Sequence, residues 1–234
     1  PLLDSLILKS PIGVSEHIIE IVHPPEHIER IKTVSEYGGS IDSDTVCSID
    51  SYDAALKAVG AGVVALDGIR SGEFDRAFCA VRPPGHHATP SQAMGFCLFN
   101  NIAIAARYAQ SIGYAKVMIV DFDVHHGNGT QDTFYEDESV FYFSSHQAYA
   151  YPGTGAESET GSGKGEGYTA NFLMMPGSSD EELFEIYEQL SSYIDSFEPD
   201  IILVSAGYDL HESDPLAQLN VTTEGVRRIV RMIL

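Results

Sequence analysis

Short apolar runs alternate along this chain with longer segments of helical periodicity. The apolar runs are typical of strands that a parallel sheet buries on both faces, and they span 77–81, 116–120, 140–144, 169–174 and 200–204. Helical patterns span 53–67, 98–112, 180–197 and 222–234. The alternation predicts an α/β fold with a central, mostly parallel sheet that helices cover on both faces.

The composition is that of a globular protein. Hydrophobic residues make up 44% of the 234 positions and charged residues 20%, which argues against disorder. No internal repeat and no convincing linker interrupts the pattern, so we expect residues 1–234 to form a single domain. The glycine-rich stretch 153–167 is predicted to be a loop.

The charge limits the classes of partner. Thirteen basic residues against 34 acidic ones give a formal charge of −21. Such a chain is a poor candidate for binding nucleic acid, because a phosphate backbone needs cationic contacts. The charge is compatible with a cationic ligand, and equally with a plain acidic surface.

The sequence predicts a cytoplasmic location. No apolar stretch is long enough to cross a membrane, and residues 1–4 lack the basic start of a signal peptide. The cysteines Cys47, Cys79 and Cys97 are widely spaced and suggest neither a disulfide framework nor a zinc pair.

Polar clusters follow three of the expected strands. They span 82–87, 121–129 and 205–209. Ligands of open α/β sheets bind beyond the carboxyl ends of the strands, so a site is expected where these clusters meet.

The second and third clusters contain candidate metal ligands. If 121–125 stays extended, Asp121, Asp123 and His125 lie on one side of the chain. Asp123 and His125 could then bind one ion, with Asp209 as a third ligand. Two carboxylates and an imidazole suit Zn²⁺ with an open position for water, and they also suit Fe²⁺. The alternative is that these residues only cap helices and turns.

The first cluster contains two adjacent histidines after a rigid Pro-Pro-Gly turn. His86 and His87 are not part of a zinc-binding HExxH helix. A neutral histidine beside a metal-bound water can take its proton, so this pair favours proton transfer.

With these residues assembled, the sequence resembles the zinc-dependent histone deacetylase superfamily. The resemblance is to the class II-like branch, which includes acetoin-utilisation proteins and acetylpolyamine amidohydrolases. It runs from about residue 78 to 221, and its motifs are RPPGHHA at 82–88, GFCLFNN at 95–101, DFDVHHGNGTQ at 121–131, YPGTG at 151–155 and GYD at 207–209.

The resemblance implies an arginase/deacetylase-like three-layer fold and a set of site residues. It implies zinc on Asp123, His125 and Asp209, and it makes His86 and His87 the paired active-site histidines. Further matches are Asp121 as the acid that hydrogen-bonds His86, Asn128 behind His87, and Gly95, Phe96 and Tyr151 in the acyl-lysine channel, where Tyr151 replaces the usual Phe.

The family also carries K⁺ or Na⁺ sites. The positions that match one site are Asp121, Asp123, His125 and Ser144. Those that match the other are Phe134, Asp137, Val140 and Tyr168.

The implied activity is hydrolysis of an acetylated lysine, polyamine or other acetylated amine by metal-activated water. Two alternatives remain. An arginase-like hydrolase would need a second metal, for which Gly127 and His211 stand where ligands are required. The other alternative is a non-catalytic acyl-amine binding module. It is suggested because the chain ends at Leu234 without the Gly-rich loop that carries the family's transition-state tyrosine. We therefore expect the chain to be a fragment that lacks this loop and an N-terminal strand, and the loss of the tyrosine would lower its activity alone.

Overall fold

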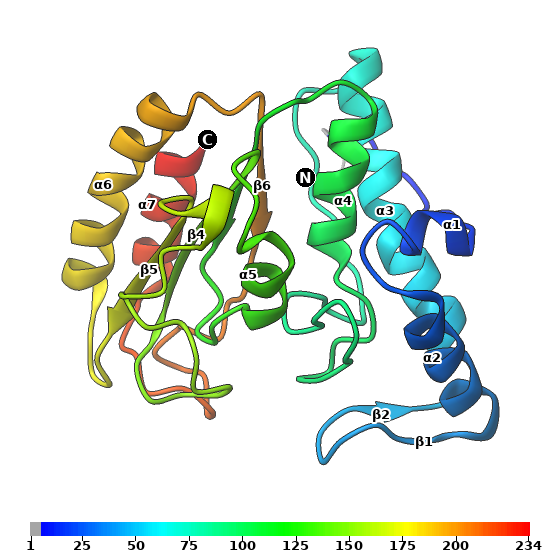
Figure 1. Cartoon of the computed structure of the whole chain (residues 1–234). Helices are drawn as coiled ribbons and strands as arrows, with labels where there is room; N and C mark the ends of the chain where they lie inside the picture. Colours follow the sequence, from blue (N-terminus) through cyan, green and yellow to red (C-terminus); the bar gives the residue numbers. More distant parts are fainter. Residues whose placement is uncertain (1–5) are drawn as a thin grey trace. The chain divides into compact units, whose positions relative to one another are not determined.

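The computed structural model describes residues 6–234 (Figure 1). The N-terminal residues 1–5, on which the absence of a signal peptide was predicted, lie outside the described part. The described chain divides into two compact units, one ending at Tyr108 and one from Ala109 to Leu234. The prediction of a single domain over 1–234 stays a prediction.

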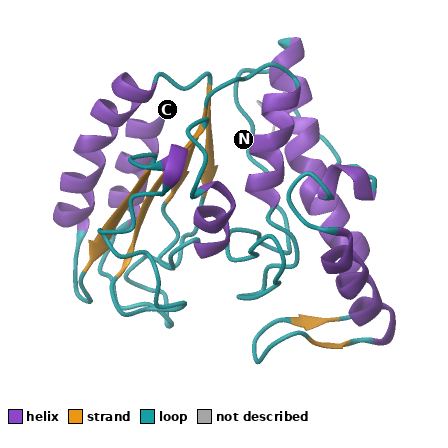
Figure 2. Cartoon of the chain, viewed as in Figure 1, coloured by secondary structure: helices purple, strands orange, loops and turns teal. Residues whose placement is uncertain are grey.

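The first unit is mainly helical (Figure 2). Its elements are α1 (Glu16–Ile19), α2 (Pro25–Tyr37), the short hairpin of β1 (Gly39–Ser40) and β2 (Val46–Cys47), α3 (Ser51–Ser71) and most of α4 (Asn101–Ser111). Its core is a cluster of buried apolar residues that includes Ile19, Ile28, Ile31, Val59, Leu98 and Phe99.

The second unit contains a parallel sheet of four strands. Its elements are β3 (Val117–Asp121), α5 (Asn128–Phe134), β4 (Val140–Gln147), a 3₁₀ turn at Gly163–Gly165, β5 (Thr169–Met174), α6 (Asp180–Phe197), β6 (Ile201–Ser205) and α7 (Thr223–Ile233). The strand order is β5-β4-β3-β6, and every pairing is parallel. The central position of β3 explains its continuous apolar run, because both of its faces are buried.

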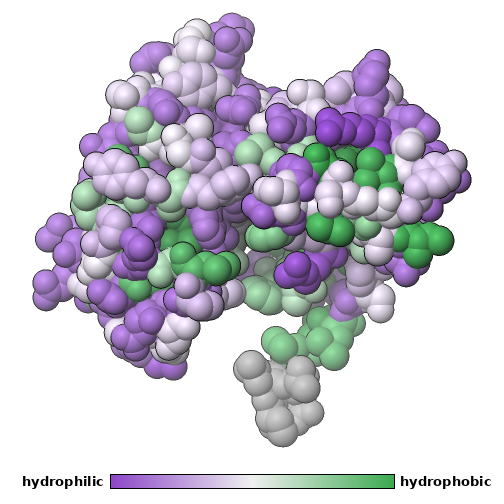
Figure 3. Space-filling view, turned by 90° about the horizontal axis from the view of Figure 1, so that it is seen from below, coloured by the Kyte–Doolittle hydropathy of each residue, from purple (hydrophilic) through white to green (hydrophobic). Residues whose placement is uncertain are grey.

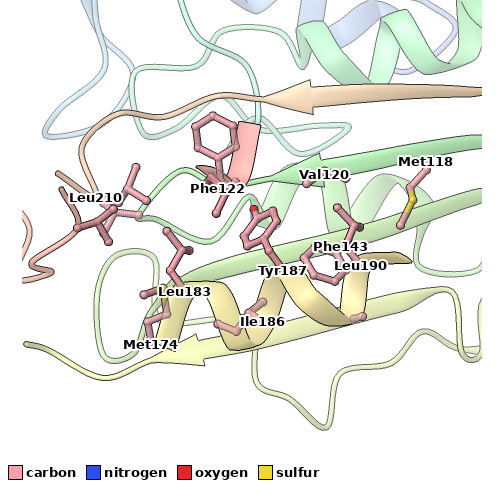
Figure 4. Close-up of a cluster of buried hydrophobic side chains, with 14 of the residues drawn as sticks. Met118, Val120, Phe122, Phe143, Met174, Leu183, Ile186, Tyr187, Leu190 and Leu210 are labelled. Atoms are coloured by element: carbon pink, nitrogen blue, oxygen red, sulfur yellow. The ribbon is translucent and has the colours of Figure 1, made fainter. Parts of the chain in front are cut away.

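One face of this sheet packs against α6 and α7 (Figure 4). Met118 and Val120 point from β3 into this core, where Leu183, Tyr187 and Leu190 of α6 meet them. The helix starts at a capping box: Glu182 accepts a hydrogen bond from the Ser179 backbone N–H at 2.8 Å, and the Ser179 hydroxyl caps the first turn.

The predicted pattern is confirmed for most elements. β5 and α6 match their predicted ranges, and β3, β4, β6, α3, α4 and α7 overlap theirs. The strand predicted at 77–81 is wrong. These residues have no regular secondary structure and no ladder partner within residues 6–234, and they remain largely exposed. An apolar run becomes a strand only when another strand satisfies its backbone.

The surface is mixed in character. Hydrophilic and hydrophobic residues are interspersed on the face shown in Figure 3. Across residues 6–234, none of the helices combines the length and apolarity that crossing a membrane requires.

Candidate functional site

Three of the predicted metal ligands converge in the second unit. Nδ1 of His125 lies 3.1 Å from Oδ1 of Asp123 and 3.0 Å from Oδ2 of Asp209. One ligand atom of each residue lies within 4.8 Å of the others, and all three side chains are partly buried. This is the only such group of three or more potential ligands among residues 6–234. Two carboxylate oxygens and one imidazole nitrogen fit a divalent transition metal.

The ends of β3 and β6 bring these ligands together. The Phe122 backbone N–H donates to the Ser205 carbonyl at 3.1 Å, so the two chains stay joined just beyond their strands. Phe122 and Val124 point into the core, which turns the alternate residues Asp123 and His125 to the opposite side. The expected alternation therefore holds, although the regular strand ends at Asp121 and the chain then bends.

Backbone hydrogen bonds hold the carboxylates in place. Oδ1 of Asp123 accepts from the His125 N–H at 2.8 Å. Oδ1 of Asp209 accepts from the Val124 N–H at 3.1 Å. Each carboxylate thus accepts a backbone hydrogen bond from the loop after β3 while it faces the imidazole of His125.

Gly207 is required beside this group. A Cβ atom at position 207 would lie 2.2 Å from Oδ2 of Asp123 and 2.6 Å from its Cα. The absence of a side chain lets the turn after β6 approach the Asp123 carboxylate.

The two carboxylates raise the pKa of His125 to about 10, first through the hydrogen bond with Asp123 and then through that with Asp209. In the metal-free protein a proton on His125 therefore takes the place that a cation would take between the two anions. Neutral imidazole is the ligand form, so a metal and this proton compete.

Asp121 and Asn128 flank Asp123 and His125 in sequence. Asp121 is fully buried: its Oδ1 accepts from the Asp123 N–H at 3.2 Å, and its Oδ2 accepts from the Tyr142 hydroxyl at 3.2 Å. Burial and the Asp121 charge raise the pKa of Tyr142 well above its ordinary value, so this phenol stays a donor. Asn128 is buried at the first position of α5.

The first unit carries the predicted histidine pair and two of the predicted channel residues. His86 and His87 are both buried, and their ring centroids are 4.0 Å apart. A Cβ atom on Gly95 would lie 2.4 Å from Cδ2 of His87, so the predicted channel glycine packs on the second histidine. Phe96 has a positive φ of 66° and is 53% exposed, which presents its ring to the outside of this unit.

Tyr151 lies in the loop between β4 and β5, beside the candidate ligands. Its ring centroid is 6.3 Å from that of His125, with the planes at 75°. The side chain is 41% exposed, as a residue at the rim of a site would be.

The positions matched to the first cation site lie around the carboxyl end of β3, and those matched to the second lie at or before the starts of β4 and β5. Ser144 pairs with Asp121 in the β3–β4 register, so the first set gathers at one edge of the sheet. In the second set, the Asp137 N–H donates to the Phe134 carbonyl at 3.0 Å, in the turn that leads to β4.

Two groups of buried histidines were not found from the sequence. His23 and His27 stack in the first unit, with ring centroids 4.8 Å apart. His126 and His146 lie 4.7 Å apart, centroid to centroid, in the second unit. The sequence could have indicated His146, because Ser144 and His146 are polar residues at alternate positions of a strand that is buried along its whole length.

This chain belongs to the histone deacetylase family, since the family model described as "Histone deacetylase domain" matches residues 1–234. A relative from Archaeoglobus fulgidus, named a probable deacetylase, is 38% identical over 229 residues, which cover 97% of this chain and 64% of that protein. The chain thus spans less than two thirds of this relative's length.

Two solved structures share the fold. The crystal structure of the HDA15 HD domain has a TM-score of 0.94 at 39% identity, covering 96% of this chain and 67% of that one. The crystal structure of acetylpolyamine aminohydrolase from Burkholderia pseudomallei has a TM-score of 0.91 at 28% identity, covering 99% and 78%. The predicted arginase/deacetylase-like α/β fold class is confirmed.

Proposed function

We propose that this domain is a metal-dependent amidohydrolase that removes acetyl groups from acetylated lysine or a related acetylated amine. The observation that carries the proposal is the convergence of Asp123, His125 and Asp209 from the ends of two strands. Membership of the histone deacetylase family supports it.

Asp123, His125 and Asp209 would hold Zn²⁺, and Fe²⁺ suits the same donors. A divalent metal supplies Lewis acidity, which polarises a carbonyl and lowers the pKa of water. The residues themselves set the geometry: the backbone N–H groups of Val124 and His125 hold one oxygen of each carboxylate. Asp121, Asp123, His125 and Ser144 would bind K⁺ or Na⁺ as a structural ion.

His86 and His87 are proposed as the proton-transfer groups. Both are buried, which suits groups that exchange protons with a substrate away from bulk water. Asp121 and Asn128 would orient them, as the resemblance implies. Each histidine must bind one proton and release it later, taking it from the attacking water and delivering it to the leaving amine.

Gly95, Phe96 and Tyr151 are proposed to line the channel for the acylated side chain. Exposed aromatic rings at Phe96 and Tyr151 offer flat apolar contact for an alkyl chain. The charge of −21 suits a substrate whose remainder is cationic, such as a polyamine or a basic peptide. We propose no direct binding of nucleic acid or membrane, and a cytoplasmic location.

The alternative of a two-metal hydrolase has less support. Both nitrogens of His211 are used locally: Nε2 lies 3.0 Å from the Thr223 hydroxyl, and Nδ1 accepts from the Ser213 N–H at 3.1 Å. Gly127 has no side chain to offer.

The test measures acetate release from an acetyl-lysine peptide and from an N-acetylated diamine by the protein that carries this domain. The Asp123→Asn and His87→Ala variants are compared with Glu212→Gln, an exposed carboxylate near Asp209 in sequence. We expect both site variants to lose about 10²- to 10³-fold in kcat/KM or more, and Glu212→Gln to keep its rate. Equal rates in all four proteins would overturn the proposal. Metal-dependent binding of the amide without turnover by the unmodified protein would favour the binding module.

A further inference from the structure

The loop that carries Tyr151 is held by buried polar side chains. It connects β4 and β5 and contains Gly153 and Gly155, both with positive φ. A glycine-rich loop is flexible by default, because glycine has the widest choice of backbone conformation. This loop is therefore ordered by its contacts with the rest of the second unit.

Glu159 fastens the loop to α5. Its Oε2 accepts from the Gly155 backbone N–H at 3.1 Å and from Nε2 of Gln131 at 2.5 Å. Gln131 is buried on α5. Nδ2 of Asn171, in β5, donates to Oε1 of Gln131 at 2.7 Å and to the Glu159 carbonyl at 3.1 Å. The Glu159 carboxylate thereby joins the loop to α5, and the Glu159 backbone carbonyl joins it to β5.

This network assigns the tautomer of His126. Because the amide nitrogen of Gln131 donates to Glu159, its Oε1 can only accept, so Nε2 of His126, 3.0 Å away, carries the proton. Nδ1 of His126 is then an acceptor, and the Thr154 hydroxyl donates to it at 2.8 Å.

His146 binds the backbone carbonyl of the same glycine, Gly155. Its Nε2 donates to the Gly155 carbonyl at 2.9 Å, and its Nδ1 lies 3.0 Å from the Ser144 hydroxyl, which donates to it. A Cβ atom on Gly155 would lie 2.5 Å from Nε2 of His146 and 2.6 Å from Cδ2 of His126. The loop backbone therefore packs directly on two imidazoles, and both hydrogen-bonding groups of Gly155 are bound.

From this geometry we infer that Glu159 and His146 are positioning residues, which act through Gly155 to hold the Tyr151 ring beside His125. The inference rests on the proposed function, since it assigns Tyr151 to the substrate channel. The anchor lies only four positions after Tyr151, so loosening it moves the ring. Neither residue is a candidate metal ligand, so their loss is expected to affect substrate binding more than metal binding.

Residues 1–234 contain no tryptophan, so Tyr151→Trp introduces the single tryptophan of this segment, at the rim, as a fluorescent reporter. In that background we compare Glu159→Gln with Glu157→Gln. Glu157 is an exposed residue of the same loop, and its replacement removes the same charge. We expect Glu159→Gln to lower the steady-state anisotropy of the tryptophan and shift its emission to the red, and Glu157→Gln to leave both unchanged.

Two substitutions of His146, made in the protein that carries Tyr151→Trp, test whether a conservative replacement preserves the order of the loop. Glutamine at position 146 keeps a side-chain N–H donor for the Gly155 carbonyl, whereas alanine removes it. We expect His146→Gln to retain most of the anisotropy that His146→Ala loses. If circular dichroism shows that His146→Ala does not fold, His146→Gln is compared with Glu159→Gln instead. If an N–H donor at position 146 is what holds the Gly155 carbonyl, the tryptophan anisotropy should change less in His146→Gln than in Glu159→Gln.

Kinetics of the proteins with Tyr151 intact give the second readout. We expect Glu159→Gln to raise KM for an acetyl-lysine peptide by about 10-fold, with a smaller change in kcat and unchanged bound metal. Glutamine still offers an acceptor oxygen, but it removes the charge that strengthens the hydrogen bonds from Gly155 and Gln131. Anisotropy equal to that of Glu157→Gln, or loss of bound metal, would overturn the inference. An unmodified protein without amidase activity would instead overturn the proposed function, because the fluorescence readout does not depend on turnover.

Discussion

Nδ1 of His125 lies 3.0 Å from Oδ2 of Asp209, although one residue follows β3 and the other follows β6. The contact exists because β3 and β6 are parallel neighbours in register, Asp121 beside Ser205, so their carboxyl ends lie together. With Asp123 on the other side of the ring, the imidazole stands between two anions.

Removing one ligand is expected to abolish tight metal binding. Asp209→Asn keeps the size of the side chain but removes the charge, so we expect zinc affinity to fall by about 100-fold or more. Because metal replaces the proton on His125, whose pKa is raised to about 10, binding at pH 7 should release about one proton from this site, and affinity should fall as pH falls. Titration calorimetry in buffers of different ionisation enthalpy measures both. Glu212→Gln is the control, and unchanged affinity in Asp209→Asn would exclude this carboxylate as a ligand.

Acid is expected to destabilise the first unit through His23. Its Nδ1–H donates to the Pro90 carbonyl at 2.9 Å, and its Nε2 accepts from the Asn100 N–H at 2.8 Å, so the ring is bound in the neutral form. Burial, and then the neighbouring His27, lower its pKa from 6.5 to about 4.

The sign of this effect follows from proton binding. Above pH 6.5 both states are mostly neutral at this residue, and the full stability is present. As pH falls from 6.5 toward 4 the unfolded chain binds a proton that folded His23 does not, so stability is lost, by about 3 kcal/mol in all and about 2 kcal/mol by pH 5. Urea unfolding at pH 7 and pH 5 should show a smaller loss in His23→Gln than in the control His17→Gln, whose ring is exposed. Equal losses would contradict the assignment.

Gly207→Ala is expected to disturb the Asp123 carboxylate, because the new Cβ would lie 2.2 Å from its Oδ2. We expect a loss of about 1–3 kcal/mol of stability and at least 10-fold weaker zinc binding. Gly13→Ala meets nothing within 4 Å and serves as the control. Thermal unfolding and metal content measure the two effects. Normal metal content in Gly207→Ala would contradict the prediction, because it would mean that the turn after β6 moves away from Asp123 without disturbing the carboxylate.

Ser179→Ala is expected to weaken the second unit without altering its site. The change removes the hydroxyl that caps α6 and half of the capping box with Glu182. We expect the free energy of unfolding to fall by about 1 kcal/mol while zinc affinity stays the same. A change in metal binding would mean that the start of α6 is coupled to the strand ends.

Local sequence pattern predicted β5 and α6 correctly but failed at 77–81, where the structure has no strand. β5 and α6 match their predicted ranges because their apolar periodicity and the acidic start of the helix are properties of adjacent residues. The run at 77–81 has the same local character, but it pairs with no strand in the part of the chain that the structure describes, and a strand needs such a partner from elsewhere in the chain.

By itself, the sequence determined the alternation of strands and helices and the polar groups that end the strands. From these, Asp123, His125 and Asp209 could be proposed together, because parallel strands gather their carboxyl ends at one edge. Only the tertiary structure decided the bend after Asp121, the approach of Gly207 and the network of Glu159, Gln131 and His146. Those contacts join residues far apart in the chain, and burial in a shared interior, which no local pattern encodes, makes their hydrogen bonds necessary.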